Sequence, residues 1–312
     1  MYILYKNIGF TISLAKKTRF SIPVPFLFRS IIGYQLRKMC CIAHNVLCAD
    51  CMFNATCIYG LTFESIVPKN NPALTGRDRI SHPVIIDCDD FTGIELDSLV
   101  LNLVFLGSTI PYFPYFYHAL KKGGESGITK ERVPYQVSDI TELSNTGKTH
   151  SLMKDDYQID TQLKPEQWEY NPETEMPAEQ EKNFEITLVT PLRYKSRGGY
   201  AGRLADAEFA GCLHRRAQVL CSQYGRNDHS GEYRFSGNWT ITEQNVKWRD
   251  FAHYSARQKK AMQLGGLVGD FTLSGKFTSY ECSLLRFAEL FHGGKNTNFG
   301  LGKIKVNEHG IL

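Results

Sequence analysis

The alternation of apolar and polar residues along the first half of the chain predicts strands and helices in a definite order. Residues 7–14 alternate as a half-buried strand does, and residues 26–40 carry apolar side chains at helical spacing. Further strands are expected at 58–67, 83–87, 99–107 and 132–141. An aromatic-rich helix is expected over 111–122, ending at Gly123-Gly124.

The second half repeats this order, with strands expected at 184–192, 239–254, 264–273 and 303–306 and helices at 204–224 and 278–291. Strand, helix, two strands, helix, strand is the order of a ferredoxin-like βαββαβ unit. We therefore expect an α+β protein with two tandem ferredoxin-like (RRM-like) domains. They would comprise residues 1–144 and 184–312, joined by a polar connector at 145–183.

Composition narrows the class of protein. The 312 residues are 42% hydrophobic, enough for two cores, and carry a net charge of +4. A mildly basic chain is compatible with an RNA partner. No apolar run is long enough to span a membrane, and the first residues lack the basic region of a signal peptide. We expect a cytoplasmic protein without a membrane partner.

Four cysteines follow the first predicted helix within a short segment: Cys41, Cys48, Cys51 and Cys57. The Cys48-x2-Cys51 spacing is typical of a metal knuckle, and the outer two lie close enough in sequence to complete a tetrahedron. Four thiolates favour a structural zinc ion, and an iron–sulfur cluster is the alternative. Cys40 can take the place of Cys41. We expect a metal-binding insertion here, without an open position for catalysis.

A glycine-rich loop near the end of the chain is the strongest candidate for anion binding. It runs from His292 to Lys303 and contains Gly294, Lys295, Gly300 and Gly302. Glycines allow close approach of backbone N–H groups to a phosphate, and lysines supply charge. The loop is not a nucleotide-binding P-loop, because Ile304 stands where Ser or Thr is required. A hairpin that binds nothing is the alternative.

Several segments of the second half together resemble one family. They are WRDFAHYSARQ at 248–258, MQLGGLVG at 262–269, the glycine-rich loop, and TPLR at 190–193. With the first helix, where Arg29 and Arg37 flank Gly33, the chain resembles the CRISPR repeat-specific endoribonucleases of the repeat-associated mysterious protein superfamily. The resemblance implies a prokaryotic protein with two ferredoxin-like domains that cleaves precursor CRISPR RNA within its repeats and leaves guide RNA as product.

The resemblance also implies a mechanism without a catalytic metal. A ribose 2′-OH attacks the adjacent phosphate and gives a 2′,3′-cyclic phosphate and a 5′-OH end. The step needs a base, an acid and donors for the phosphorane oxygens. His292 beside the glycine-rich loop and His44 after the first helix are the candidates for proton transfer, and Lys295 is the candidate for charge stabilisation.

The remaining candidates are basic, aromatic and amide side chains suited to RNA contact. The predicted RNA-binding residues are Arg29, Arg37, Arg193, Arg197, Tyr254, Arg257, Gln258, Gly294, Lys295, Gly300, Gly302 and Lys303. Two other functions stay open. One is a non-catalytic RNA-binding subunit of a CRISPR effector or adaptation complex. The other is a zinc-stabilised module that binds protein within a reverse-transcriptase and integrase assembly.

Overall fold

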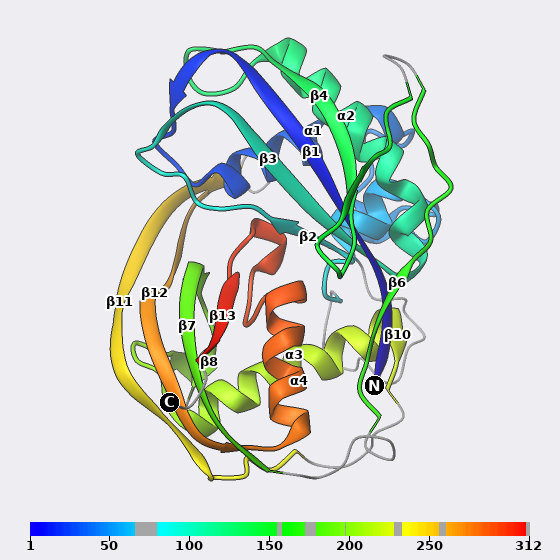
Figure 1. Cartoon of the computed structure of the whole chain (residues 1–312). Coiled ribbons are helices and arrows are strands. Elements are labelled where there is room, and N and C mark those ends of the chain that lie inside the picture. The colour runs from blue at the N-terminus through cyan, green and yellow to red at the C-terminus, as the bar shows by residue number, and fades with distance from the viewer. Residues whose placement is uncertain are drawn as a thin grey trace. The chain divides into compact units, whose positions relative to one another are not determined.

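The chain forms two compact units, and each is described by itself (Figure 1). In the computed structural model, the described residues are 1–65, 80–154, 158–171, 179–196, 198–227, 233–255 and 260–309, without the side chains of 252–255 and 260–263. The N-terminal unit comprises Ile3–Gln167, and the C-terminal unit comprises Met1–Tyr2 with Trp168–Leu312. No helix among the described residues has the length and apolar character needed to cross a membrane.

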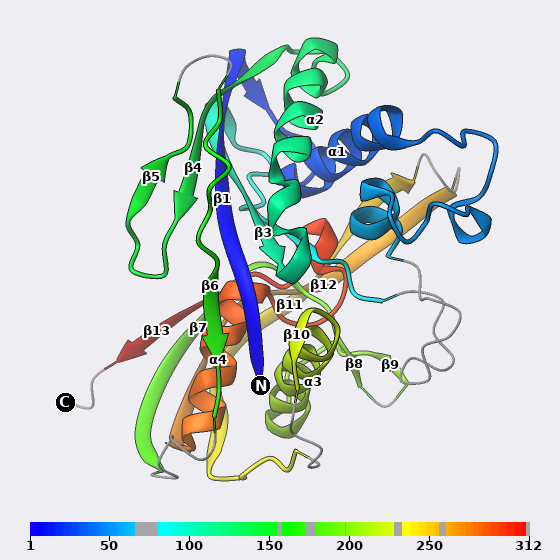
Figure 2. The same ribbon diagram turned by 90° about the vertical axis from the view of Figure 1, so that its right-hand side faces the viewer.

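The N-terminal unit follows the order strand, helix, two strands, helix, strand. Its elements are β1 (Tyr2–Arg19), α1 (Val24–Cys40), β2 (Val84–Asp87), β3 (Glu95–Leu106), α2 (Phe113–Ser126), β4 (Tyr135–Leu143) and β5 (Thr149–Ser151), with short helical turns at Cys48–Asp50, Gly60–Glu64 and Gly107–Tyr112. The antiparallel sheet has the order β2-β3-β1-β4-β5. Helices α1 and α2 pack side by side against one face of this sheet (Figure 2).

Alternating side chains of the strands build the core of this unit. Phe10 of β1 lies opposite Leu101 of β3 and Ile140 of β4, and all three are fully buried. On α1, Phe28 and Ile32 repeat at the spacing of one helical turn and complete the core. The alternation that predicted these strands therefore reports which face of the sheet is covered.

The structure differs from the prediction at two places in this unit, the end of α2 and the strand expected at 58–67. Helix α2 runs through Gly123 and Gly124 and ends before Gly127, which has a φ of 75°. The two glycines leave room for Tyr135, because a Cβ at either position would collide with it. The strand expected at 58–67 is instead a helical turn, Gly60–Glu64, as far as Ser65, where the described residues stop.

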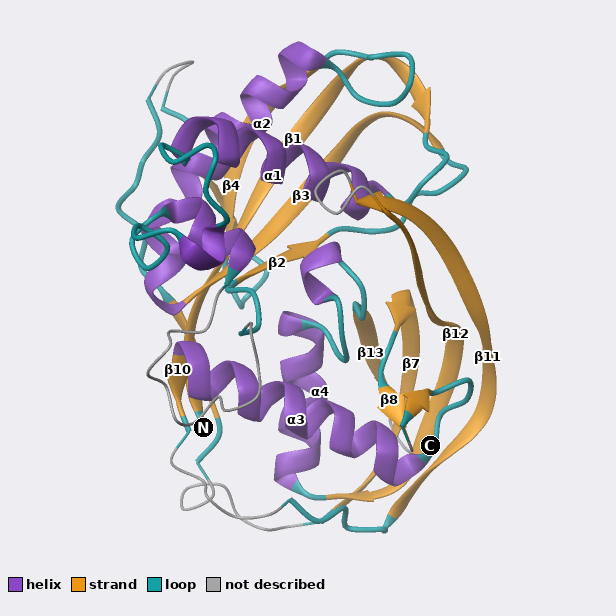
Figure 3. Ribbon diagram, turned by 180° about the vertical axis from the view of Figure 1, so that it is seen from behind, coloured by secondary structure: helices purple, strands orange, loops and turns teal. Residues whose placement is uncertain are grey.

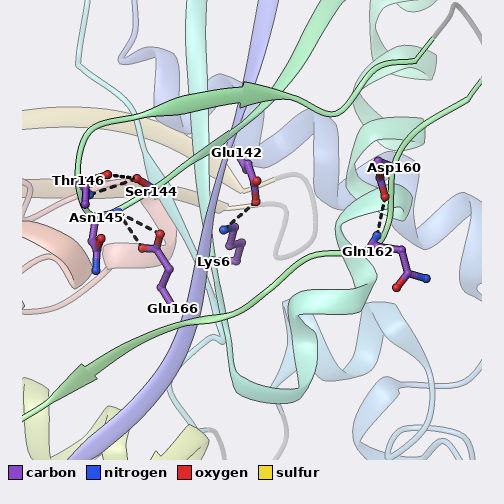
Figure 4. Close-up of polar contacts among 8 residues, drawn as sticks. All are labelled: Lys6, Glu142, Ser144, Asn145, Thr146, Asp160, Gln162 and Glu166. Atoms are coloured by element: carbon purple, nitrogen blue, oxygen red, sulfur yellow. Dashed lines mark hydrogen bonds and ion pairs between the residues drawn. The ribbon is translucent and has the colours of Figure 1, made fainter.

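Polar contacts hold the end of β4 and the chain that follows it (Figure 4). The Lys6 side chain, which is nearly buried, makes an ion pair of 2.7 Å with Glu142. Farther along, the backbone N–H of Asn145 donates to both carboxylate oxygens of Glu166 at 3.0 Å. Glu166 begins β6 (Glu166–Glu169), which pairs with β1, so the bonds from Asn145 fix the start of that strand.

The C-terminal unit repeats the same order of elements. They are β7 (Gln180–Leu192), α3 (Asp206–Tyr224), β11 (Trp239–Ser255), β12 (Lys260–Phe277), α4 (Ser279–Phe291) and β13 (Ile304–His309), with short pieces β8 (Lys195–Ser196), β9 (Gly199–Tyr200), β10 (Gly225–Arg226) and a turn at Thr297–Phe299. The antiparallel sheet has the order β11-β12-β7-β13. Helices α3 and α4 cover one of its faces (Figure 3).

Helix α4 begins at a capping box and ends at the glycine-rich loop. The Thr278 hydroxyl accepts the N–H of Glu281 at 3.2 Å, and the Glu281 carboxylate accepts the N–H of Thr278 at 3.0 Å. Phe287 and Phe291 of this helix are fully buried. The helix ends at Phe291, and the glycine-rich loop begins at the next residue, His292.

Candidate nucleic-acid interface

The glycine-rich loop between α4 and β13 is fastened to the end of β7. Thr190 supplies most of the attachment. Its hydroxyl donates to the Gly300 carbonyl at 2.7 Å and accepts the N–H of Lys303 at 2.8 Å, while its own N–H donates to the Lys303 carbonyl at 3.2 Å. Thr190 is buried, so these bonds are shielded from water. The loop therefore has one defined path over the strand end.

The glycines of the loop serve close backbone packing. The N–H of Gly293 donates to the Gly302 carbonyl at 2.8 Å, and the N–H of Gly302 donates to the Pro191 carbonyl at 3.0 Å. A Cβ at Gly302 would collide with the Gly293 carbonyl, and one at Gly294 with the Arg193 carbonyl. Gly294, Gly300 and Gly302 also have φ values of 73–79°. Several N–H groups expected to face a phosphate are thus bonded within the protein.

A buried arginine lies beneath the loop. Arg216 of α3 is 8% exposed, and its Nη2 donates to the Phe291 carbonyl at 3.2 Å and to Thr297 Oγ1 at 2.8 Å. Burial lowers the pKa of Arg216 to about 10. No carboxylate among the described residues makes an ion pair with it. The C-terminal carbonyl of α4 offers the partial negative charge that favours this cation.

His292 is part of this internal network. Its side chain is fully buried, its φ is 59°, and its Nδ1 lies 3.1 Å from the Leu301 carbonyl. A general acid or base must reach the substrate directly or through one water. The burial of His292 therefore weighs against direct proton transfer and suits a residue that fixes the loop.

One exposed cation of the loop, Lys295, is joined to Arg193 through the backbone. Lys295 is exposed, and its N–H donates to the Arg193 carbonyl at 2.7 Å, while Lys303 is half-buried. The Arg193 guanidinium donates to the Gly265 carbonyl at 3.3 Å and lies 3.8 Å from the centre of the Tyr200 ring. Lys295 and Arg193, both predicted RNA contacts, are thus brought together on one part of the C-terminal unit.

Comparisons with known proteins agree with this architecture. A model of the CRISPR-associated endoribonuclease Cas6 matches residues 186–304, and a model described as the AF_1859_N N-terminal domain matches residues 5–168. Residues 186–304 therefore belong to the Cas6 family. No curated protein sequence matches the chain significantly.

Solved structures of the Cas6 family share the fold. Thermus thermophilus Cas6 aligns with a TM-score of 0.53 at 12% identity, covering 98% of this chain and 99% of its own. A Cas6 product complex aligns with a TM-score of 0.51 at 12% identity, covering 97% and 99%. A partial Cas6-RT-Cas1–Cas2 complex aligns with a TM-score of 0.52 at 12% identity, and the alignment covers 99% of this chain and 47% of that chain.

The other predicted RNA contacts fall in several places along the chain. In the N-terminal unit, the Arg29 guanidinium lies 5.0 Å from the centre of the Phe63 ring, Arg37 is exposed in the last turn of α1, and His44 is exposed in the loop that follows. The Tyr254 backbone pairs with Ala261 in the β11–β12 hairpin. Arg197, Arg257 and Gln258 lie outside the described residues.

The cysteine-rich segment of the N-terminal unit forms a pocket of about 180 Å³. All four predicted ligands, Cys41, Cys48, Cys51 and Cys57, line it together with Cys40, and all five thiols are free. Burial raises the pKa of the Cys40 and Cys48 thiols. Within the described ranges, however, no three Cys, His, Asp or Glu side chains are arranged to hold a metal ion. The thiols share one pocket but do not form the preassembled tetrahedron that the spacing predicted.

Proposed function

We propose that this chain cleaves precursor CRISPR RNA within its repeats, by attack of a ribose 2′-OH on the adjacent phosphate. The products would be a 2′,3′-cyclic phosphate and a 5′-OH end. One observation carries the proposal: the glycine-rich loop, inside the segment that matches the Cas6 model, presents exposed Lys295 next to Arg193. Two adjacent cations can bind a phosphodiester and stabilise the charge of its transition state.

The arrangement of strands and helices in each unit supports this proposal. We assign both units to the ferredoxin-like class, because β2-β3-β1-β4 and β11-β12-β7-β13 show the same antiparallel strand order. In each unit, two helices lie on one face of the sheet (Figures 2 and 3).

The catalytic roles divide as follows in the proposal. Lys295 stabilises the phosphorane oxygens, because its ammonium is exposed while its backbone is fixed to Arg193. His44 is the general base or acid, because it is the exposed imidazole of the two candidates. His292 acts indirectly: bonded to Leu301, it fixes the loop that carries Lys295.

A non-catalytic RNA-binding subunit of a CRISPR effector or adaptation complex is the second candidate function. The full burial of His292 favours it, because one of the two candidate proton-transfer groups cannot meet substrate in this conformation. This chain is similar in structure to part of a longer chain in a Cas6-RT-Cas1–Cas2 complex. A reverse-transcriptase and integrase assembly is therefore a partner to test.

We also propose that the cysteine pocket takes up one zinc ion. The support is chemical: five free thiols line one pocket, and thiolates are preferred zinc ligands. Cys48, Cys51 and Cys57 with Cys41 or Cys40 would be the ligands. Elemental analysis of natively purified protein should find about one zinc per chain, lowered in Cys51→Ser. Absence of both zinc and iron would remove this proposal.

Cleavage of repeat RNA in EDTA tests the main proposal. Wild-type protein should cut its own CRISPR repeat at one position with EDTA present, because the nucleophile belongs to the RNA. His44→Ala should slow single-turnover cleavage by about 10²- to 10⁴-fold with little change in binding. His309→Ala, at another exposed imidazole, is the control. Tight binding of the repeat without any cleavage by wild-type protein would favour the non-catalytic subunit.

A further inference from the structure

An aromatic pair, one exposed tyrosine and one half-buried tryptophan, lies beside Arg193. Tyr200 of β9 is 44% exposed, and its ring centre lies 6.3 Å from that of Trp248 on β11. Arg193 lies over the Tyr200 ring at 3.8 Å, and the Lys195 ammonium is 6.0 Å from the ring centre. We call Tyr200, Trp248, Arg193 and Lys195 the aromatic platform. None of its aromatic members was predicted as an RNA contact.

The strands hold the platform in a fixed geometry. Trp248 Nε1 donates to Asp250 Oδ1 at 2.9 Å, which orients the indole. Gly265 lies opposite Asp250 in the β11–β12 ladder, and a Cβ there would come within 2.8 Å of the Trp248 ring. The Gly265 carbonyl also accepts the Arg193 guanidinium. Gly265 therefore makes room for the indole and anchors the arginine at once.

The chemistry of the platform suits one class of ligand. Aromatic rings stack on unpaired nucleobases of any sequence, worth about 1–3 kcal/mol per base. Exposed lysine and arginine bind the phosphates on either side of such a base. Lys195 is exposed and Arg249, also exposed, follows Trp248 directly. A nucleotide inside a duplex has both faces stacked on its neighbours, so this chemistry suits an unpaired nucleotide.

We propose that the aromatic platform is a stacking site for one unpaired nucleobase of bound RNA, with Lys195 on the neighbouring phosphate. This site adds detail to the proposed function, and it rests on that function only in taking RNA as the ligand. It assigns to the platform a nucleotide outside any base-paired part of the substrate. Recognition there would be tolerant of sequence, because stacking uses the face of the base and not its edge.

Tryptophan fluorescence offers a direct test on the full-length protein. The chain has three tryptophans, and Trp168 and Trp239 are 7% and 5% exposed, so a base stacked on the platform should quench mainly Trp248. A short oligouridine should quench the emission, and a blunt RNA duplex should not. Trp248→Phe should remove the quenching. Quenching that persists in Trp248→Phe, or equal quenching by the duplex, would overturn the proposal.

Substitutions at Tyr200 measure the contribution of stacking to affinity. Tyr200→Ala should weaken oligouridine binding about 5- to 150-fold, the range for one stacked base, while Tyr200→Phe should bind as wild type. Tyr115 of the N-terminal unit is also 44% exposed, so Tyr115→Ala is the matched control. Wild-type affinity in Tyr200→Ala, or the same loss in Tyr115→Ala, would refute the platform. Circular dichroism checks that each variant is folded.

Cleavage of repeat RNA separates this inference from the proposed function. If wild-type protein cleaves the repeat but Tyr200→Ala binds oligouridine with unchanged affinity, the platform is wrong and the proposed function stands. If oligouridine binding depends on Tyr200 and Trp248 but no repeat RNA is cleaved, the platform stands and the proposed enzymatic function fails.

Discussion

Replacing Gly302 by alanine should loosen the glycine-rich loop from β7. The position has a φ of 79°, which costs an L-residue about 1–2 kcal/mol. The added Cβ would also collide with the Gly293 carbonyl. Moving apart would weaken two backbone hydrogen bonds, from Gly293 to Gly302 at 2.8 Å and from Gly302 to Pro191 at 3.0 Å, each worth about 1 kcal/mol.

The expected loss for Gly302→Ala is therefore about 2–4 kcal/mol of unfolding free energy. A domain typically has about 5–15 kcal/mol, so the variant should remain folded and measurable by urea unfolding. Gly202→Ala is the matched control, because no heavy atom lies within 4 Å of its Cβ position. It should change stability by less than about 0.5 kcal/mol. Equal stability of the two variants would refute the close packing of the loop.

Three further perturbations test other parts of the structure by urea unfolding. Arg216→Met removes the hydrogen bonds to the Phe291 carbonyl and the Thr297 hydroxyl, and each lost bond should lower the unfolding free energy by about 1–3 kcal/mol. In the double variant with Thr297→Val, the loss of unfolding free energy should be less than the sum of the losses in the two single variants. Lys6→Met should cost about 1–3 kcal/mol by leaving Glu142 unpaired, and Lys6→Met with Glu142→Leu should recover most of it; no recovery would contradict the ion pair as the cause. Burial, with a smaller effect of Arg215, lowers the pKa of His214 below its ordinary 6.5. As the pH falls, the unfolded chain therefore binds this proton before the folded chain does, and stability should fall below a pH of about 6.5. His214→Phe should reduce that fall, and an unchanged pH profile would contradict it.

The long strands and helices follow from the sequence because their patterns report burial. Residues 184–192 and 278–291 were expected as a strand and a helix, and the structure has β7 at Gln180–Leu192 and α4 at Ser279–Phe291. The end of α2 was missed, because Gly123 and Gly124 are required by Tyr135, a contact that appears only in the folded unit. Local spacing does not contain that information.

The candidate site was partly predictable for the same reason. Lys295 and Arg193 were found by charge and motif, and the structure joins them through one backbone hydrogen bond. The burial of His292 depends on the path of the loop over β7, which a motif does not specify. Tyr200 and Trp248 lie far apart in the sequence, and only the strand hairpins bring their rings together.

The most direct measurement of the central claim uses a CRISPR repeat with a single 2′-deoxy nucleotide at the mapped cleavage position. The proposed mechanism takes its nucleophile from that 2′-OH, so the deoxy repeat should bind with wild-type affinity and remain uncut. Mass spectrometry of the unmodified reaction should find a 2′,3′-cyclic phosphate and a 5′-OH end. Cleavage of the deoxy repeat at the rate of the all-ribose repeat would contradict the account.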